Sequence, residues 1–221
     1  MNQTLATVPA EQAADPQISI NPLHLQAAAL FLDPAHERPY CKGVYIEVKP
    51  TEQFIVGTDS KRIFIARNEI RSRPELCGTY LLSGEDVKRL RKARHVYLGK
   101  PRGAEVLATY YEGDRDKGQK GQRAFIALIE SSYPQFRQFA SYAAEAPDAP
   151  AAQYSADHIA DCGRAAKMLG SHQFYLRNVL ISARGMGLVT FSVPDAFALI
   201  QEIKLDRSAY ELPVWVDRLN Q

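Results

Sequence analysis

One short stretch of the sequence concentrates positive charge. The net charge of the whole chain is only +2, so affinity for a polyanion has to come from local clusters of this kind. Cations on a solvated surface are sufficient to bind DNA phosphates without reading bases. By charge alone, the pattern is also typical of an ordinary solvated helix face beside an apolar stripe. The cations of this cluster are Lys88, Arg89, Arg91, Lys92 and Arg94.

A second group of polar residues has a spacing that could suggest a metal site. His158, Asp161 and Cys162 would share one helix face at positions i, i+3 and i+4. The sequence adds no further ligands at metal-site spacing, so an ordinary helix face is the better interpretation and we predict no metal.

Asp59, next to Lys61 and Arg62, could suggest phosphate chemistry. The sequence contains neither a glycine-rich phosphate loop nor a G-x-S-x-G nucleophile motif to support it. We therefore predict a protein that is not an enzyme and needs no cofactor.

Composition limits the class of protein. The chain has 221 residues, 46% hydrophobic and 24% charged, which is typical of a globular protein of two modest domains, or one and a half. Its three cysteines are far apart, which favours reduced thiols in a cytoplasm. No apolar run approaches the about 18 residues of a membrane span, and the N-terminus lacks a signal pattern. We expect a cytoplasmic protein without a membrane segment.

Residues 42–70 predict a β ribbon around which the other elements are organised. Val44, Ile46 and Val48 alternate with Tyr45 and Glu47, the period-two signal of a half-buried strand. A turn follows, and residues 54–65 form the returning strand. Small and polar residues interrupt that strand at 57–62, which predicts either a bulge or a tight connection.

The same order of elements occurs three times: a short strand, a capping residue, a helix and a β ribbon. The caps are Asn21, Ser83 and Ser155. Residues 42–46 parallel residues 177–181, and residues 184–187 are expected to form the turn of the third ribbon. Residues 197–205 fit a strand better than a helix, although both patterns are present. An Ala- and Pro-rich segment at 140–152 predicts a linker.

Two motifs resemble a known family. The first comprises GVYIEV at 43–48 and FIVGTDSKRIFIAR at 54–67, and the second is IESSYPQFR at 129–137. They are similar to the middle domain of the bacterial DNA polymerase sliding clamp, the β subunit, which has a strand ending in Ala-Thr-Asp-Gly-His-Arg-Leu and an Ile-Asp-Gly-Lys-Phe-Pro-Asp-Tyr-Arg segment. The resemblance is clear over residues 18–140, and the motifs lie in the same order as in the family.

The resemblance implies an α+β sliding-clamp fold, in which a domain consists of two strand–helix–strands halves. Three such halves give one full clamp domain and a shortened one. We expect residues 1–17 to be a flexible tail, residues 18–143 the clamp-like domain and residues 150–221 the shortened domain.

The resemblance also implies two sites. Clamp helices line a hole that faces DNA, which makes the five cations of residues 88–94, together with Arg164 and Lys167, candidate phosphate contacts. The helix at 21–32 departs from this pattern because it has no Lys or Arg. Clamps also bind short peptides of polymerases and repair proteins where the middle and last domains meet. The matching positions are Thr58, Ser60, Lys61, Ile63, Leu212 and Pro213.

Three substitutions separate this pocket from that of the family. Ser60 replaces a glycine, Lys61 replaces a histidine and Ala140 replaces a proline. Partner specificity therefore does not transfer, and Ile63 could be plain core with Lys61 on the surface.

The leading prediction is a sliding-clamp-like processivity or replication-associated factor that binds duplex DNA without sequence preference and associates with the nucleoid. The alternative is a clamp-derived protein that binds DNA polymerase or other replication proteins through short peptides and does not encircle DNA. In either case we expect a homo-oligomer, most simply a twofold dimer. Its expected basis is an exposed sheet edge in the shortened domain, with Phe197, Leu199 and Trp215 exposed.

Overall fold

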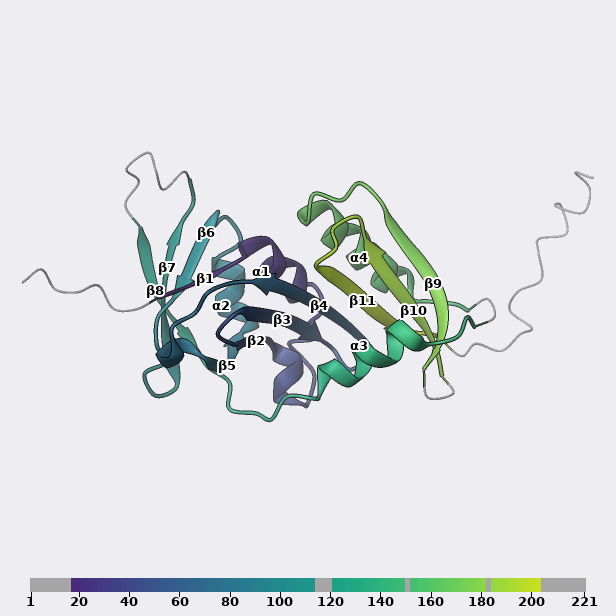
Figure 1. Ribbon diagram of the computed structural model, residues 1–221, viewed down its shortest axis with the longest axis horizontal. Helices are drawn as coiled ribbons and strands as arrows, with labels where there is room; N and C mark the ends of the chain where they lie inside the picture. Colours follow the sequence, from purple (N-terminus) through teal and green to yellow (C-terminus); the bar gives the residue numbers. More distant parts are fainter. Residues whose placement is uncertain (1–16, 114–120, 150–151, 182–183, 204–221) are drawn as a thin grey trace, which may run out of the picture.

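The computed structural model describes residues 17–113, 121–149, 152–181 and 184–203 (Figure 1). These residues form three successive units and two antiparallel sheets, which confirms the predicted α+β class. Within the described ranges, no helix has both the length and the apolar character needed to cross a membrane.

The units repeat one order of elements. The first contains β1 (Ile18–Ile20), α1 (Pro22–Ala29), β2 (Gly43–Val48), β3 (Glu52–Thr58) and β4 (Arg62–Glu69). The second contains β5 (Gly78–Ser83), α2 (Gly84–Arg89), β6 (His95–Leu98), β7 (Glu105–Tyr111) and β8 (Gln122–Ala127). After α3 (Phe136–Glu145), the third contains α4 (Ala156–Met168), β9 (Phe174–Ile181), β10 (Arg184–Phe191) and β11 (Ala196–Gln201). Two short 3-10 helices, Pro39–Lys42 and Pro74–Leu76, complete the set.

Strand exchange joins the units. β1 of the first unit pairs with β6 of the second, and β5 of the second pairs with β2 of the first. β4 and β11 pair across the first and third units. The result is a seven-stranded sheet, in the order β5-β2-β3-β4-β11-β10-β9, and a four-stranded sheet, in the order β1-β6-β7-β8. The larger sheet therefore runs through both predicted domains.

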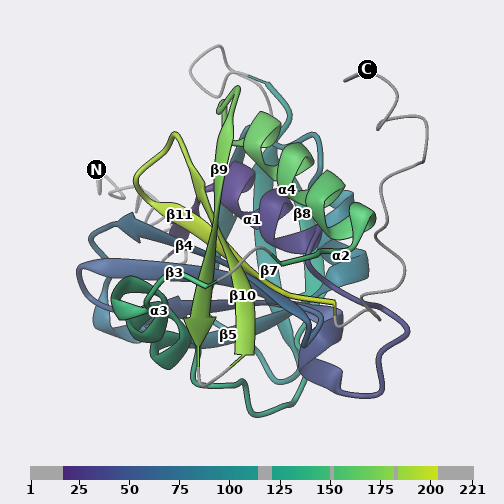
Figure 2. The ribbon, with the colours of Figure 1, turned by 90° about the vertical axis from the view of Figure 1, so that its right-hand side faces the viewer.

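The helices divide between the two faces of the larger sheet (Figures 1 and 2). α1, α2 and α4 bury side chains such as Leu25, Val87 and Cys162 in the main core, which the four-stranded sheet shares. α3 buries Phe136 and Ala143 against the opposite face, beside Val179 and other β-strand residues. α1 packs against both α2 and α4, so these three helices form one row.

Several local predictions need correction. α3 extends to Glu145 and includes the first part of the predicted linker, because alanine favours helix and Phe136 and Ala143 become buried. α2 ends at Arg89, and the N–H of Arg94 donates to Tyr111 O at 2.8 Å as the chain enters β6. Asn21 caps α1 with its side chain, whereas the side chains of Ser83 and Ser155 make no capping hydrogen bond.

The third unit differs from its sequence interpretation. No strand precedes α4 among the described residues, although the C=O of Gln153 accepts from Ile203 N at 2.7 Å. The glycine-rich segment 184–187 begins β10 and is not a turn. A side chain at Gly187 would come within 2.7 Å of Leu176, so this glycine provides space for packing.

The predicted parallel between residues 42–46 and 177–181 is wrong by one residue. Val44 faces the helix row, whereas Val179 faces α3, and a shift by one residue reverses every side chain of a strand. Residues 196–201 are a strand, as favoured. β11 pairs on both sides, however, and Leu199 is buried, so Phe197 and Leu199 do not form the expected exposed edge. Trp215 lies outside the described residues.

Candidate functional site

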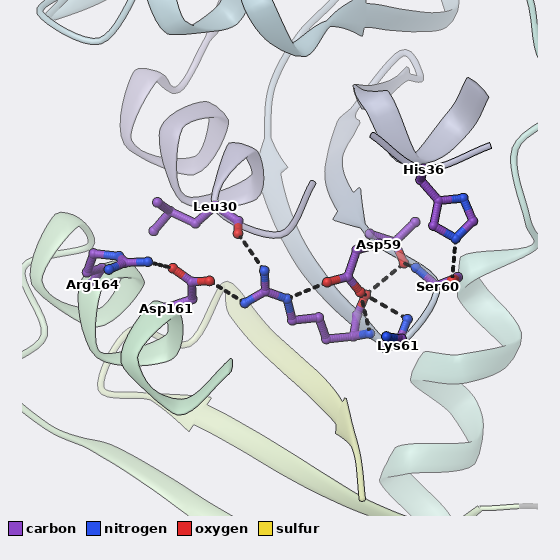
Figure 3. Close-up of polar contacts among 9 residues, drawn as sticks. Leu30, His36, Asp59, Ser60, Lys61, Asp161 and Arg164 are labelled. Carbon is purple, nitrogen blue, oxygen red and sulfur yellow. Dashed lines mark hydrogen bonds and ion pairs between the residues drawn. The ribbon is translucent and has the colours of Figure 1, made fainter. Parts of the chain in front are cut away.

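The polar break in the first ribbon is the tight connection between β3 and β4. Thr58 Oγ1 donates to Arg62 O at 2.7 Å, and Asp59 Oδ1 accepts from the N–H groups of Lys61 and Arg62, each at 2.9 Å. Ser60 adopts a left-handed backbone conformation with φ of 71°. The connection is therefore shaped by its own side chains, and Lys61 projects at its tip (Figure 3).

Arg62 is buried and joins three elements through its hydrogen bonds. Its partners Leu30, Asp59 and Asp161 are labelled in Figure 3. Its Nε donates to Asp59 Oδ2 at 2.7 Å, its Nη1 donates to Asp161 of α4, and its Nη2 donates to Leu30 O at 3.1 Å after α1. The guanidinium carbon also lies 5.2 Å from the centroid of the Phe31 ring. Burial alone would lower the pKa of Arg62, but the hydrogen bonds to Asp161 and Asp59 raise it above its usual value.

This network gives Asp161, one of the three residues considered as metal ligands, a structural role. Both carboxylate oxygens of Asp161 accept from arginines, one from Arg62 and the other from Arg164. Burial raises the pKa of Cys162 to about 12, so its sulfur stays a protonated thiol at neutral pH. The arrangement supports a structural ion-pair network that holds α4 against the first unit.

A cavity of about 580 Å³ opens beside the β3–β4 connection, where the first and third units meet. Its apolar wall comes from the 3-10 helix Pro39–Lys42, β4, the segment before α3, α3 itself, β9 and β10. Phe139 and Tyr142 of α3 reach it with 38% and 51% of their surface exposed. The apolar and aromatic residues of this wall are Tyr40, Ile63, Pro134, Phe139, Tyr142, Ile181 and Met186.

Cations line the cavity together with these apolar residues. Arg38, Lys61 and Arg184 line the cavity and are exposed. Arg62 also lines the cavity, but it is buried and its charge is paired with Asp59. None of the described acidic residues lines the cavity. The combination suits a ligand with bulky apolar groups next to negative charge.

Four predicted peptide contacts come together here, since Thr58, Ser60, Lys61 and Ile63 all line the cavity. Leu212 and Pro213 lie outside the described residues. Ala140 lines a neighbouring cavity of about 350 Å³. Sequence reasoning missed Phe139 and Tyr142, although an amphipathic pattern from Phe136 onwards could have revealed the helix that carries them.

The predicted DNA contacts do not form one helical stripe. All seven side chains are exposed, but only Lys88 and Arg89 belong to α2. Arg91, Lys92 and Arg94 follow in the segment that leads to β6. Arg89 pairs with Asp86 at 2.8 Å.

The two remaining predicted contacts, Arg164 and Lys167, lie on α4. Arg164 donates to Asp161, so part of its charge is compensated within the helix. The uncharged helix α1 separates this pair from the cluster near α2, because α1 packs against both helices. The cations therefore form two separate basic surfaces.

Comparisons with known proteins support the fold. No protein-family model matches the sequence, and no curated protein matches it significantly. Among solved structures, the sliding clamp of Pseudomonas aeruginosa matches with a TM-score of 0.61 at 12% identity, covering 86% of this chain and 67% of that chain. The Bacillus subtilis clamp gives 0.60 at 14% identity, covering 92% and 67%.

A third match is the Helicobacter pylori beta clamp in complex with 3,4-difluorobenzamide, with a TM-score of 0.61 at 15% identity. It covers 89% of this chain and 69% of that chain. These matches agree in covering most of this chain and only about two thirds of each clamp. The chain therefore has the fold of the bacterial DNA polymerase sliding clamps in a shortened form.

Proposed function

We propose that this protein is a sliding-clamp-like accessory factor of DNA replication, acting in the cytoplasm by binding and not by catalysis. One observation carries the proposal: four residues expected at a peptide site line a single, largely apolar cavity together with three exposed cations. Its volume of about 580 Å³ is in the range of pockets that bind small ligands or a few side chains. The partner is then a short linear peptide of a replication protein.

The lining indicates what such a peptide contains. Phe139, Tyr142 and Met186 offer apolar contact area, and burial of one large apolar side chain contributes roughly 1.5–3 kcal/mol. Lys61 and Arg184 favour acidic side chains beside the apolar anchors and disfavour basic ones. We therefore expect a peptide with two bulky apolar residues and neighbouring acids.

A fluorescein-labelled peptide with Leu-Phe between two acidic residues tests the pocket by fluorescence anisotropy. We expect binding to the wild-type protein, and at least about tenfold weaker binding to Phe139→Ala/Tyr142→Ala, because truncated aromatic anchors commonly cost 1 kcal/mol or more. Both side chains are exposed, so the fold should survive their replacement.

The matched control is Phe125→Ala, which removes an exposed aromatic ring of β8 outside the pocket. It should bind the peptide like the wild type. Equal binding by all three proteins, or equal binding of a peptide with Ala-Ala in place of Leu-Phe, contradicts a peptide site in this cavity.

The exposed cations near α2 support a second candidate function, contact with duplex DNA. Lys88, Arg91, Lys92 and Arg94 have no ion pair among the described residues, which leaves their charges available for phosphates. Such contacts position a protein on DNA without selecting a sequence. The uncharged α1 argues for a limited contact surface and not for a continuous basic lining.

For the basic surface, we expect Arg91→Ala/Lys92→Ala/Arg94→Ala to weaken duplex binding equally on unrelated sequences. It should also flatten the plot of log K against log salt concentration, because each phosphate contact contributes about 0.9 to its slope. Electrophoretic mobility shifts at several salt concentrations give both quantities.

The control Arg67→Ala/Arg71→Ala/Arg73→Ala removes the same charge from exposed side chains in β4 and the segment after it. It should leave the slope closer to that of the wild type. DNA binding that is absent at low salt, or a slope that both triple variants change equally, argues against this surface and leaves the peptide-binding function standing.

A further inference from the structure

The four-stranded sheet packs one face against the helix row, and Figure 1 shows no described α-helix on its other side. Val96, Val106 and Ile126 point to the packed face, because all three belong to the main core. Side chains alternate between the two faces along each strand, so the neighbours of these residues point outward. We call this outer surface the aromatic face; its central residues are Tyr97, Leu107, Thr109, Tyr111, Arg123 and Phe125.

Three aromatic rings stand on neighbouring strands of the aromatic face. Phe125 is 55% exposed, and Tyr97 and Tyr111 are each partly exposed. The rings of Tyr97 and Tyr111 meet edge to face, with their centroids 6.2 Å apart. Phe125 is two strands away from Tyr97, a separation of about 10 Å in a β-sheet. The rings are therefore far enough apart to contact separate flat groups of one ligand.

The centre of the aromatic face is ordered by its own contacts. Thr109 is only 7% exposed, and Gln17 Nε2 donates to its Oγ1 at 3.1 Å. Thr109 also lies directly opposite Arg123 across β7 and β8, so the two side chains are neighbours. A Cβ atom at Gly121 would come within 2.8 Å of the Tyr111 ring, so this ring lies against the backbone of the chain. A ligand that binds here loses little free energy to the ordering of side chains.

Positive charge accompanies the rings. Arg123 is exposed on the aromatic face, and Lys100 is exposed in the connection between β6 and β7. The N–H of Arg94 donates to Tyr111 O at 2.8 Å, which brings the basic surface near α2 up to this end of the sheet. Among the described strands of the sheet, Glu105 is the one acidic residue on the outer side. The charge therefore complements a ligand that carries several negative groups.

We propose that the aromatic face binds single-stranded nucleic acid, with bases stacked on the rings and phosphates beside the cations. Every base has a flat π face, so stacking of this kind tolerates any sequence. Open faces of four-stranded sheets bind unpaired bases in this way in RNA-recognition domains, where two or three bases stack on aromatic side chains. The bases of a duplex are stacked inside the helix and do not reach such rings. The inference therefore depends on neither duplex binding nor the peptide cavity.

Fluorescence anisotropy with two labelled probes tests the proposal: an oligothymidine and an abasic oligomer of the same length. Both probes carry the same phosphates, so a difference in affinity between them reports the stacking of bases. We expect the wild type to bind oligothymidine at least about fivefold more tightly. Phe125→Ala should weaken oligothymidine binding at least about fivefold and leave binding of the abasic oligomer unchanged. Phe125→Tyr keeps a ring and should bind both probes like the wild type.

The matched control is Tyr175→Ala, which removes a 65% exposed ring from β9 in the other sheet and should bind both probes like the wild type. An oligouridine of the same length distinguishes RNA from DNA as the source of the strand, and a preference for bases in either series supports the proposal. Equal affinity of the wild type for all three probes overturns it, as does equal weakening by Phe125→Ala and Tyr175→Ala. A wild-type dimer in sedimentation velocity that only Phe125→Asp dissociates would assign the aromatic face to a second copy and also overturns it.

Discussion

Replacing Gly57 by alanine should lower the free energy of unfolding by about 3 kcal/mol or more. A Cβ atom at this position of β3 would lie 2.0 Å from Ala28 O and 2.7 Å from the carbonyl carbon of Ala28. Both are backbone atoms of α1, which cannot give way as the end of a flexible side chain can. α1 is held between α2, α4 and the sheet, so the added methyl group has to displace the centre of the helix row.

Urea unfolding followed by circular dichroism measures this change. Gly163→Ala is the matched control, because Gly163 lies in α4 and its added Cβ would meet only a Phe174 ring carbon at 3.9 Å. Alanine favours helix over glycine by about 1 kcal/mol, so this variant should be as stable as the wild type or more stable. Similar stability of the Gly57 and Gly163 variants would mean that α1 does not press against β3 as described.

Arg62→Met should lower the free energy of unfolding by about 3–5 kcal/mol, since removing one partner of a buried ion pair leaves the other charge without compensation. Asp59 would keep its bonds to backbone N–H groups and Asp161 its bond to Arg164, but both would lose the guanidinium between them. The exposed pair Arg67–Glu52 provides the control, because Arg67→Met should cost less than about 1 kcal/mol.

A double variant separates the ion pair from simple loss of packing. Arg62→Met/Asp161→Leu removes the stranded carboxylate together with its arginine, so its destabilisation should be clearly smaller than the sum of the two single changes. Additive effects would show that Arg62 stabilises the protein through packing alone.

The Arg62 network also connects stability to the proposed peptide site. Arg62 fixes the end of the β3–β4 connection, whose residues Thr58, Ser60 and Lys61 line the cavity. Under conditions where Arg62→Met is still folded, we expect weaker peptide binding than in the wild type, even though the ring contacts of Phe139 and Tyr142 remain. Unchanged affinity would separate the network from the site.

Local pattern was sufficient for most elements of the first unit. The alternation of Val44, Ile46 and Val48 predicted β2, and Asn21 correctly marked the start of α1. The polar break at 57–62 is the tight connection, one of the two structures expected there. These features depend on neighbours within a few residues, where periodicity and capping dominate. The cations of residues 88–94 were expected on a helix, but α2 ends at Arg89 and the chain then leads into β6, which pairs with β7. A local pattern does not contain this contact.

The sequence by itself determined the repeated order of elements, and its resemblance to sliding clamps predicted the α+β class and four residues that line the candidate pocket. Only the tertiary structure decided that Arg62 is buried and connects Asp59 to Asp161. Arg62 and Asp161 are 99 residues apart in the chain. It also placed α3 over the second core, which brought Phe139 and Tyr142 to the cavity. The physical reason is that charge pairing and apolar burial depend on which distant surfaces meet, whereas strand alternation and helix capping are set within one segment.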